Sequence, residues 1–174
     1  MKNTIQTTFN SFVKENNLKI AISFSMPKGY ETAFGTYDVT KQTLFLNESL
    51  FDKKERLFFT LFHELCHAKQ YAHPECFKEE ISLSLPYVVL YDGTVFKLEK
   101  DQWKTGKLDL ENAIEIYNNL PYELSANSFA FEECKKIKAL DQQEIKAIYE
   151  KTLPKEKIEF EELKKIFKQI DNLK

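Results

Sequence analysis

The stretch His63-Glu64-Leu65-Cys66-His67 has the pattern HExxH, and the rest of the chain is interpreted from it. On a helix, residues four positions apart lie one above the other, so His63 and His67 can offer two imidazoles to one metal ion. Two of the three histidines of the chain stand in this motif. Glu64 can then accept a proton from a water on the metal, which predicts the general base of a zinc hydrolase.

The residues around the motif favour a buried helix. No glycine or proline occurs between Lys53 and His73, and the segment from Leu57 to Leu65 is apolar on most sides. A buried helix that carries two histidines and a glutamate needs partners for them, and a metal with a bound water meets that need. Cys66 is offset from the line through the two histidines, so we expect a buried thiol there rather than a ligand.

A catalytic zinc site needs a third protein ligand, and the sequence offers two candidates. The first is Glu123, in the segment Pro121-Tyr122-Glu123-Leu124-Ser125-Ala126-Asn127. Pro121 suits the first turn of a helix, which runs without a breaker to about Lys138. On this helix Asn127 follows Glu123 by one turn, where its amide can hydrogen-bond a ligand.

The second candidate is His73, which extends the motif to HExxHxxQxxH. This is close to the metzincin pattern HExxHxxGxxH, but Gln70 replaces the glycine at which the chain turns back to the metal. Both methionines also precede the motif, so no Met-turn follows it. We therefore favour Glu123 over His73, and His73 stays open as a ligand, as an oxyanion donor or as a surface residue.

The two motifs together resemble a known group of enzymes. The segment His63 to Tyr71, followed by Pro121 to Ala130, resembles gluzincin-like minimal zinc metallopeptidases of bacteria and phages, and in particular the ImmA/IrrE type, whose second motif is ExxANxFA. The resemblance covers about residues 20–138. It implies Zn²⁺ as the cofactor, His63, His67 and Glu123 as its ligands, and Glu64 as the general base.

A second resemblance involves the first motif alone. The segment from His63 to Ala68 is similar to SprT-type proteases, which take a later histidine as the third ligand. This similarity keeps His73 under consideration.

The order of elements predicts an α+β fold. We expect a helix over residues 4–17, then strands over 19–26, 32–39 and 42–46, and then the HExxH helix. The strands would form a small three-stranded, mostly antiparallel sheet packed on the HExxH helix and on the second ligand-bearing helix. The segment 32–37 is our candidate for a sheet edge beside the metal, where an extended peptide can pair as an extra strand.

We expect residues 1–174 to form one zincin-like metallopeptidase domain with a core over about residues 20–138. Residues 75–120 are interpreted as an insertion that contains a hairpin around Asp92-Gly93. That hairpin either walls the cleft or covers the end of the domain. Residues 141–174 are expected to form a C-terminal helical extension whose apolar stripe completes a core or binds a partner.

Composition limits the classes of partner. The net charge of −2 favours no direct contact with nucleic acid, and no stretch is long and apolar enough to span a membrane. Three cysteines and no secretory signal predict a cytoplasmic protein. The expected partner is a protein or peptide substrate, and the ImmA/IrrE resemblance implies an intracellular regulator, often of a mobile element.

Two further points stay open at this level. The oxyanion of the reaction would need a donor besides the metal, and Tyr71, Tyr122 and His73 are the candidates. The alternative function is a catalytically inactive zincin-fold protein with a structural zinc that binds a protein partner. A closed site that uses His73 as a fourth ligand would favour this alternative.

Overall fold

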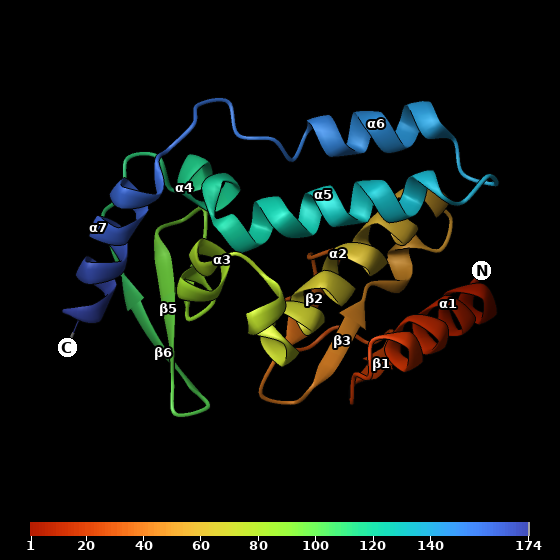
Figure 1. Ribbon diagram of the computed structural model, residues 1–174, viewed down its shortest axis with the longest axis horizontal. Coiled ribbons are helices and arrows are strands. Elements are labelled where there is room, and N and C mark those ends of the chain that lie inside the picture. Colours follow the sequence, from red (N-terminus) through yellow and green to blue (C-terminus); the bar gives the residue numbers. More distant parts are fainter. Residues whose placement is uncertain (174) are drawn as a thin grey trace.

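The structure is a computed structural model, and it describes residues 1–173. Its central element is α2 (Lys54–Ala72), which carries the HExxH motif and is buried along most of its length. It packs against α5 (Pro121–Lys135), so that the two helices run through the middle of the molecule (Figure 1). Small side chains on α5 allow the close approach, since Ala126 and Ala130 are both fully buried.

The first sheet consists of β1 (Ala21–Ser23), β2 (Gly35–Asp38) and β3 (Thr43–Leu46), in the order β1-β3-β2. β2 pairs with β3 in the antiparallel direction, but β1 pairs with β3 in parallel. The sheet is therefore mixed, which corrects the expectation of mostly antiparallel pairing. The reason is that the chain crosses from β1 to the far edge before β3 returns between them. The predicted edge position of the second strand is confirmed, because β2 is an edge strand.

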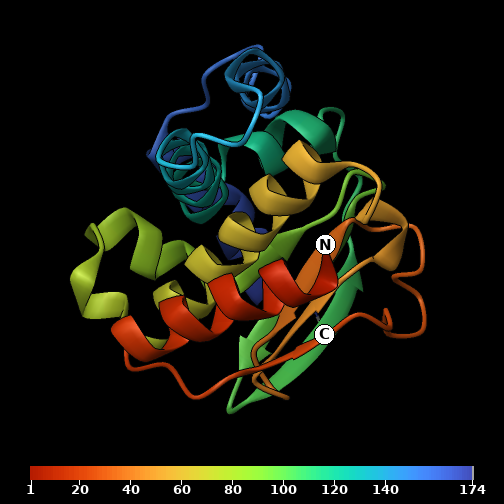
Figure 2. The ribbon, with the colours of Figure 1, turned by 90° about the vertical axis from the view of Figure 1, so that its right-hand side faces the viewer.

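Four helices and this sheet share the first apolar cluster. α1 (Lys2–Glu15) contributes Ile5, Phe9 and Phe12, and α6 (Gln142–Glu150) contributes Ile145 and Ile148. The remaining buried side chains come mainly from α2, α5 and β3. Figure 2 looks nearly along α5 and α6, which lie side by side, with α1 and the sheet on the other side of α2.

The predicted insertion holds a second sheet. β4 (Tyr87–Val89) and β5 (Thr94–Glu99) form the expected hairpin around Asp92-Gly93. β6 (Gln102–Lys107) adds a third antiparallel strand that the sequence did not predict. The turn before β6 consists of Lys100 and Asp101, with φ angles of 48° and 62°. Such a turn favours Asn and Gly, and neither is present, so no local signal marks it.

A second apolar cluster lies under this sheet. Short helices precede and follow the second sheet, namely the 3-10 turn Pro74–Cys76, α3 (Glu79–Ser84) and α4 (Ala113–Asn119). Another 3-10 turn, Glu48–Leu50, precedes α2 and contributes Leu50 to the first cluster. α7 (Phe160–Asp171) lies on the outer side of β5 and β6 (Figure 1). Its Leu163, Phe167 and Ile170 are buried in the cluster, which confirms that the apolar stripe of the last helix completes a core. No helix among residues 1–173 is long and apolar enough to cross a membrane.

Candidate metal centre

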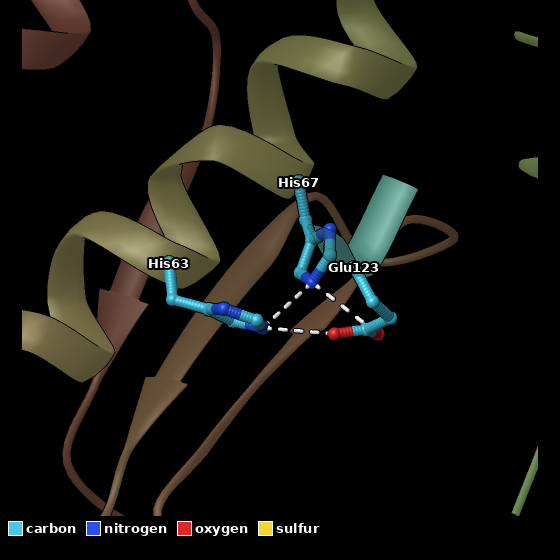
Figure 3. A group of neighbouring side chains, drawn as sticks. All are labelled: His63, His67 and Glu123. Carbon is cyan, nitrogen blue, oxygen red and sulfur yellow. Dashed lines mark hydrogen bonds and ion pairs between the residues drawn. The ribbon is translucent and has the colours of Figure 1, made fainter. Parts of the chain in front are cut away.

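The two histidines of the motif point to the same side of α2 (Figure 3). The Nε2 atoms of His63 and His67 lie 2.9 Å apart, and the rings meet edge to face. This arrangement follows from the four-residue spacing on a helix, which stacks the two side chains one turn apart. His67 is buried and His63 is partly exposed, so the pair lies at the boundary between the core and solvent.

Glu123 reaches the same point from α5. Its Oε2 is 3.2 Å from Nε2 of His63, and its Oε1 is 3.6 Å from Nε2 of His67 (Figure 3). Pro121 occupies the first turn of α5, as the sequence predicted, and this places Glu123 in that turn, facing α2. His63, His67 and Glu123 can together hold a metal ion, since their ligand atoms all lie within 4.8 Å of one another.

The donor set fits a bound cation. Two imidazoles and one carboxylate converge, and Oε2 of Glu123 is buried without a hydrogen-bond partner among the described residues. A buried carboxylate oxygen in that state is costly unless a cation compensates it. A metal ion at this point would do so.

Gln70 sets the orientation of His67. Its Nε2 donates to the carbonyl of Tyr122 over 3.0 Å, so its Oε1 must face Nδ1 of His67, which lies 2.9 Å away. Nδ1 therefore carries the proton, and the lone pair of Nε2 is left for a metal. Gln70 is completely buried. The sequence had suggested Asn127 for such a role; Asn127 is buried on the expected face of α5, but the hydrogen bond to a ligand comes from Gln70.

The electrostatics couple Glu123 to the histidines. Burial by itself disfavours the charged form of Glu123, but the charge of His67 and the close approach of both imidazoles hold the pKa of Glu123 well below its usual range. Burial also works against the imidazolium of His67, and the neighbouring Glu123 outweighs it and raises the pKa of His67 to about 9. Without a metal, the site is therefore an ion pair inside the protein.

Glu64 lies between the histidines and the first sheet. It is buried, and burial raises the pKa of its carboxyl, while the charges of His63 and His67 and the backbone amide of Tyr37 act in the opposite direction. Gly35 of β2 is packed directly against it, because a Cβ on Gly35 would lie 3.1 Å from Cγ of Glu64 and 2.7 Å from Cγ2 of Thr60. β2 thus holds the Glu64 side chain from one side.

His73 lies outside this group. α2 continues through Gln70 to Ala72, so the chain does not turn back at the position where the metzincin pattern has glycine. His73 follows the last helical residue, and its Nδ1 is 3.5 Å from Oε1 of Glu75. Cys66 is also outside; burial raises the pKa of its thiol to about 12.

The two tyrosines expected as oxyanion donors are engaged elsewhere. The hydroxyl of Tyr71 donates to the carbonyl of Leu85, and the hydroxyl of Tyr122 donates to the carbonyl of Tyr87. Tyr117 of α4, which sequence reasoning missed, lines the same cleft as His63 and Glu64. Burial, with the charges of Glu123 and Glu64 and a hydrogen bond to Glu123, raises the pKa of Tyr117 well above its ordinary value. No local signal distinguishes it, since it is one of eight tyrosines.

The three ligand side chains open into a cleft between the two sheets. The cleft has a volume of about 390 Å³, with β2 on one side and residues of β4, β5 and β6 on the other. The floor carries His63, Glu64, His67 and Glu123. The candidate metal site therefore lies in a cleft that is partly open to solvent.

Comparison with known proteins gives a match for the N-terminal part of the chain, which contains His63 and His67. Residues 2–80 match the SprT-like family. The matched segment contains α1, the first sheet and the whole HExxH helix, and it ends before the second sheet and before Glu123. No curated protein and no solved structure matches the chain. The similarity to the SprT-like family is therefore a property of the N-terminal part, while the third candidate ligand lies outside it.

Proposed function

We propose that this protein is a zinc-dependent metallopeptidase that hydrolyses a peptide bond in a protein. The observation that carries the proposal is the convergence of His63, His67 and Glu123 at the floor of an open cleft, with Glu64 beside them. This combination of two histidines one helical turn apart, a third ligand and an adjacent glutamate is typical of catalytic zinc sites. The similarity of residues 2–80 to the SprT-like family supports it.

Zinc held by these side chains would supply Lewis acidity toward the substrate carbonyl and toward water. The carboxylate of Glu64 then takes the proton of the attacking water and delivers it to the leaving amine. Glu64 is buried directly beside the three ligand residues, which is the position that such a proton carrier needs.

Tyr117 is our candidate for the oxyanion donor in place of Tyr71, Tyr122 and His73. Tyr117 lines the cleft together with Glu64 and Glu123, and a tyrosine hydroxyl is a neutral donor at neutral pH. A neutral donor in a buried place can stabilise charge that develops on the substrate carbonyl oxygen.

The partly open cleft and the edge strand beside it favour a peptide over a small amide as the substrate. β2 is the edge strand of the first sheet and lines the cleft, so it offers backbone groups with which an extended chain can pair. A small-molecule amidase would be expected to enclose its substrate more fully.

The two resemblances suggest different relatives for the enzyme. The ligand set with Glu123 follows the ImmA/IrrE pattern, whereas the match over residues 2–80 is to the SprT-like family, whose third ligand is a later histidine by the resemblance given above. We favour Glu123 because His73 is turned toward Glu75. A cytoplasmic regulator as the substrate, as the ImmA/IrrE resemblance implies, remains part of the proposal.

The test is the metal content of the protein purified without added zinc, together with cleavage of an unfolded protein such as casein. We expect about one zinc per chain, lost in His67→Ala and in Glu123→Ala and kept in His73→Ala. Glu64→Gln should keep its zinc and lose cleavage, because only the general base is removed. If Glu64→Gln cleaves as fast as the parent, the assignment of the base is wrong.

The same variants also test the alternative function, in which the protein binds a structural zinc and has no catalytic activity. A closed site would need a fourth protein ligand, and His73 is the residue that the sequence offered for it. Zinc loss in His73→Ala, with no cleavage by the parent, would favour that alternative.

A further inference from the structure

Both faces of the second sheet carry apolar side chains, and α7 covers only one of them. Val89 and Val95 are paired across β4 and β5 on the covered face, and both are fully buried. On this side Tyr87 stacks on Phe167 of α7, with ring centroids 4.4 Å apart. An ion pair between Lys97 and Asp171 also ties β5 to α7. The part of this face around Val89 and Val95 is thus part of the core.

The opposite face of the sheet lines the cleft. Side chains alternate along a strand, so Val88, opposite Phe96, lies on the other face from Val89. Trp103 of β6 lies diagonally from Phe96, and the two rings meet edge to face with centroids 6.5 Å apart. Val88, Phe96 and Trp103 are each partly exposed and line the cleft that holds the candidate metal site.

The chemistry of this wall selects one kind of side chain. The residues that β4, β5 and β6 contribute to it are Val88, Phe96 and Trp103, none of which is charged. A charged substrate side chain against such a surface would lose water without gaining a partner. A large apolar side chain would gain from burial and from contacts with the aromatic rings.

The opposite wall determines how a side chain reaches this surface. An extended peptide paired with the edge of β2 has its backbone beside Glu64, and its side chains alternate between two directions. Since β2 and the second sheet face each other across the cleft, one of these directions leads toward Phe96 and Trp103.

We propose that the second sheet is the specificity wall of the peptidase, and that the substrate carries a large apolar or aromatic side chain, next to the cleaved bond, which packs on Phe96 and Trp103. The inference rests on the proposed function, because it assumes that the protein cleaves peptides. The preference for an apolar side chain rests on the partly exposed apolar residues of the sheet. It assigns a role to residues 87–107, which lie outside the segment that is similar to the SprT-like family.

Trp103 is the single tryptophan of the chain, so its fluorescence reports on this wall alone. The probes are two randomised peptide libraries that differ only in a central Phe or a central Ala. They are titrated into zinc-loaded Glu64→Gln, whose zinc content is checked first. We expect the Phe library to shift the emission to the blue in a saturable way, and the Ala library to leave it unchanged. Equal responses to both libraries would overturn the proposal.

Cleavage by the parent protein gives a second readout, through mass spectrometry of the products of a mixed library. We expect Phe, Leu or Met to be enriched at one position beside the cut, and Phe96→Ala to lower this preference over Ala by about 10- to 100-fold. Leu153→Ala, an exposed apolar residue outside the cleft, is the control and should keep the preference. An unchanged preference in Phe96→Ala would contradict the assignment.

The two readouts separate the two proposals. Binding of the Phe library by Glu64→Gln, with no cleavage by the parent, would refute the peptidase and leave the apolar binding wall standing. Cleavage without any preference for apolar residues would refute the specificity wall and leave the peptidase standing.

Discussion

Gln70 connects α2 and α5, the two helices that carry the candidate metal ligands, through hydrogen bonds of its side chain. It is bonded to the imidazole of His67 on α2 and to the carbonyl of Tyr122, the residue before Glu123 on α5. It can therefore fix the tautomer of one ligand and the position of another at the same time. In metal sites, such partners of the ligands contribute substantially to affinity.

We predict that Gln70→Leu lowers zinc affinity by about 10- to 100-fold, since His67 loses the acceptor that holds its Nδ1 proton. The measurement is competition for zinc with a chelating dye. Asn127→Ala is the matched control, because it removes a buried amide near Glu123 that makes no hydrogen bond to a ligand among the described residues. A larger loss in Asn127→Ala than in Gln70→Leu would contradict the assignment.

The ion pair of His67 and Glu123 makes the metal-free protein sensitive to pH. The pKa of His67 in the folded protein, about 9, lies above its ordinary value of 6.5. A raised pKa means that the protonated form favours folding, so this contribution is complete below about pH 6.5 and is lost as the pH rises through about 9. The raised pKa of Glu64 acts in the same direction, because ionising that buried carboxyl opposes folding.

We therefore predict that the free energy of unfolding, measured by urea denaturation in the presence of a chelator, falls between about pH 6.5 and 9. In Glu123→Gln the fall should be much smaller, because the neutral amide no longer raises the pKa of His67. A parent curve that is flat over this range would show that the pair is not ionised in the metal-free protein.

Among the elements that carry no candidate ligand, β2 packs directly against Glu64. It lies at the edge of its sheet and packs on α2 through Gly35, where an added Cβ would be 2.7 Å from Cγ2 of Thr60 and 3.0 Å from the carbonyl oxygen of Phe45. A contact below 3.0 Å forces something to move. The glycine thus allows the edge strand β2 and the HExxH helix α2 to approach each other.

We predict that Gly35→Ala destabilises the protein by about 1–3 kcal/mol and slows cleavage, since the methyl group displaces either β2 or the side chain of Glu64. Thr60→Ser removes the methyl group that forms the shortest contact, so the double variant should recover part of the stability. Thermal unfolding of the parent, both single variants and the double variant gives this coupling. Strictly additive effects would mean that Thr60 is not what the new methyl group meets.

For the whole molecule, the candidate metal site lies between the apolar cluster around α2 and the cluster under the second sheet. Its ligands come from α2 and α5, which meet only in the folded chain. Zinc should therefore bind the folded state far better than the unfolded state, and binding is then coupled to stability.

We predict that free zinc at a hundredfold excess over its dissociation constant raises the free energy of unfolding by about 2.7 kcal/mol. Differential scanning calorimetry with and without a chelator measures this shift. His67→Ala should lose the response to zinc, while His73→Ala should keep it. An equal response in both variants would place the stabilising zinc elsewhere.

What the sequence alone determined is local. The HExxH spacing equals about one helical turn, so the shared face of His63 and His67 required no knowledge of other elements. The start of the C-terminal helical extension at residue 141 is also local, because the carboxylate of Asp141 accepts from the backbone amides of Gln143 and Glu144. The hairpin at Asp92-Gly93 and the apolar stripe of α7 also follow from short-range patterns.

The tertiary structure decided what depends on contacts between distant segments. Whether Glu123 or His73 would join the two histidines depended on how α5 packs on α2 and on where α2 ends. The direction of β1, the third strand β6, and the approach of Gln70 and Tyr117 to the site likewise had no local signal. The physical reason is that these positions result from the packing of whole elements, in which each side chain is placed by neighbours far away in the chain.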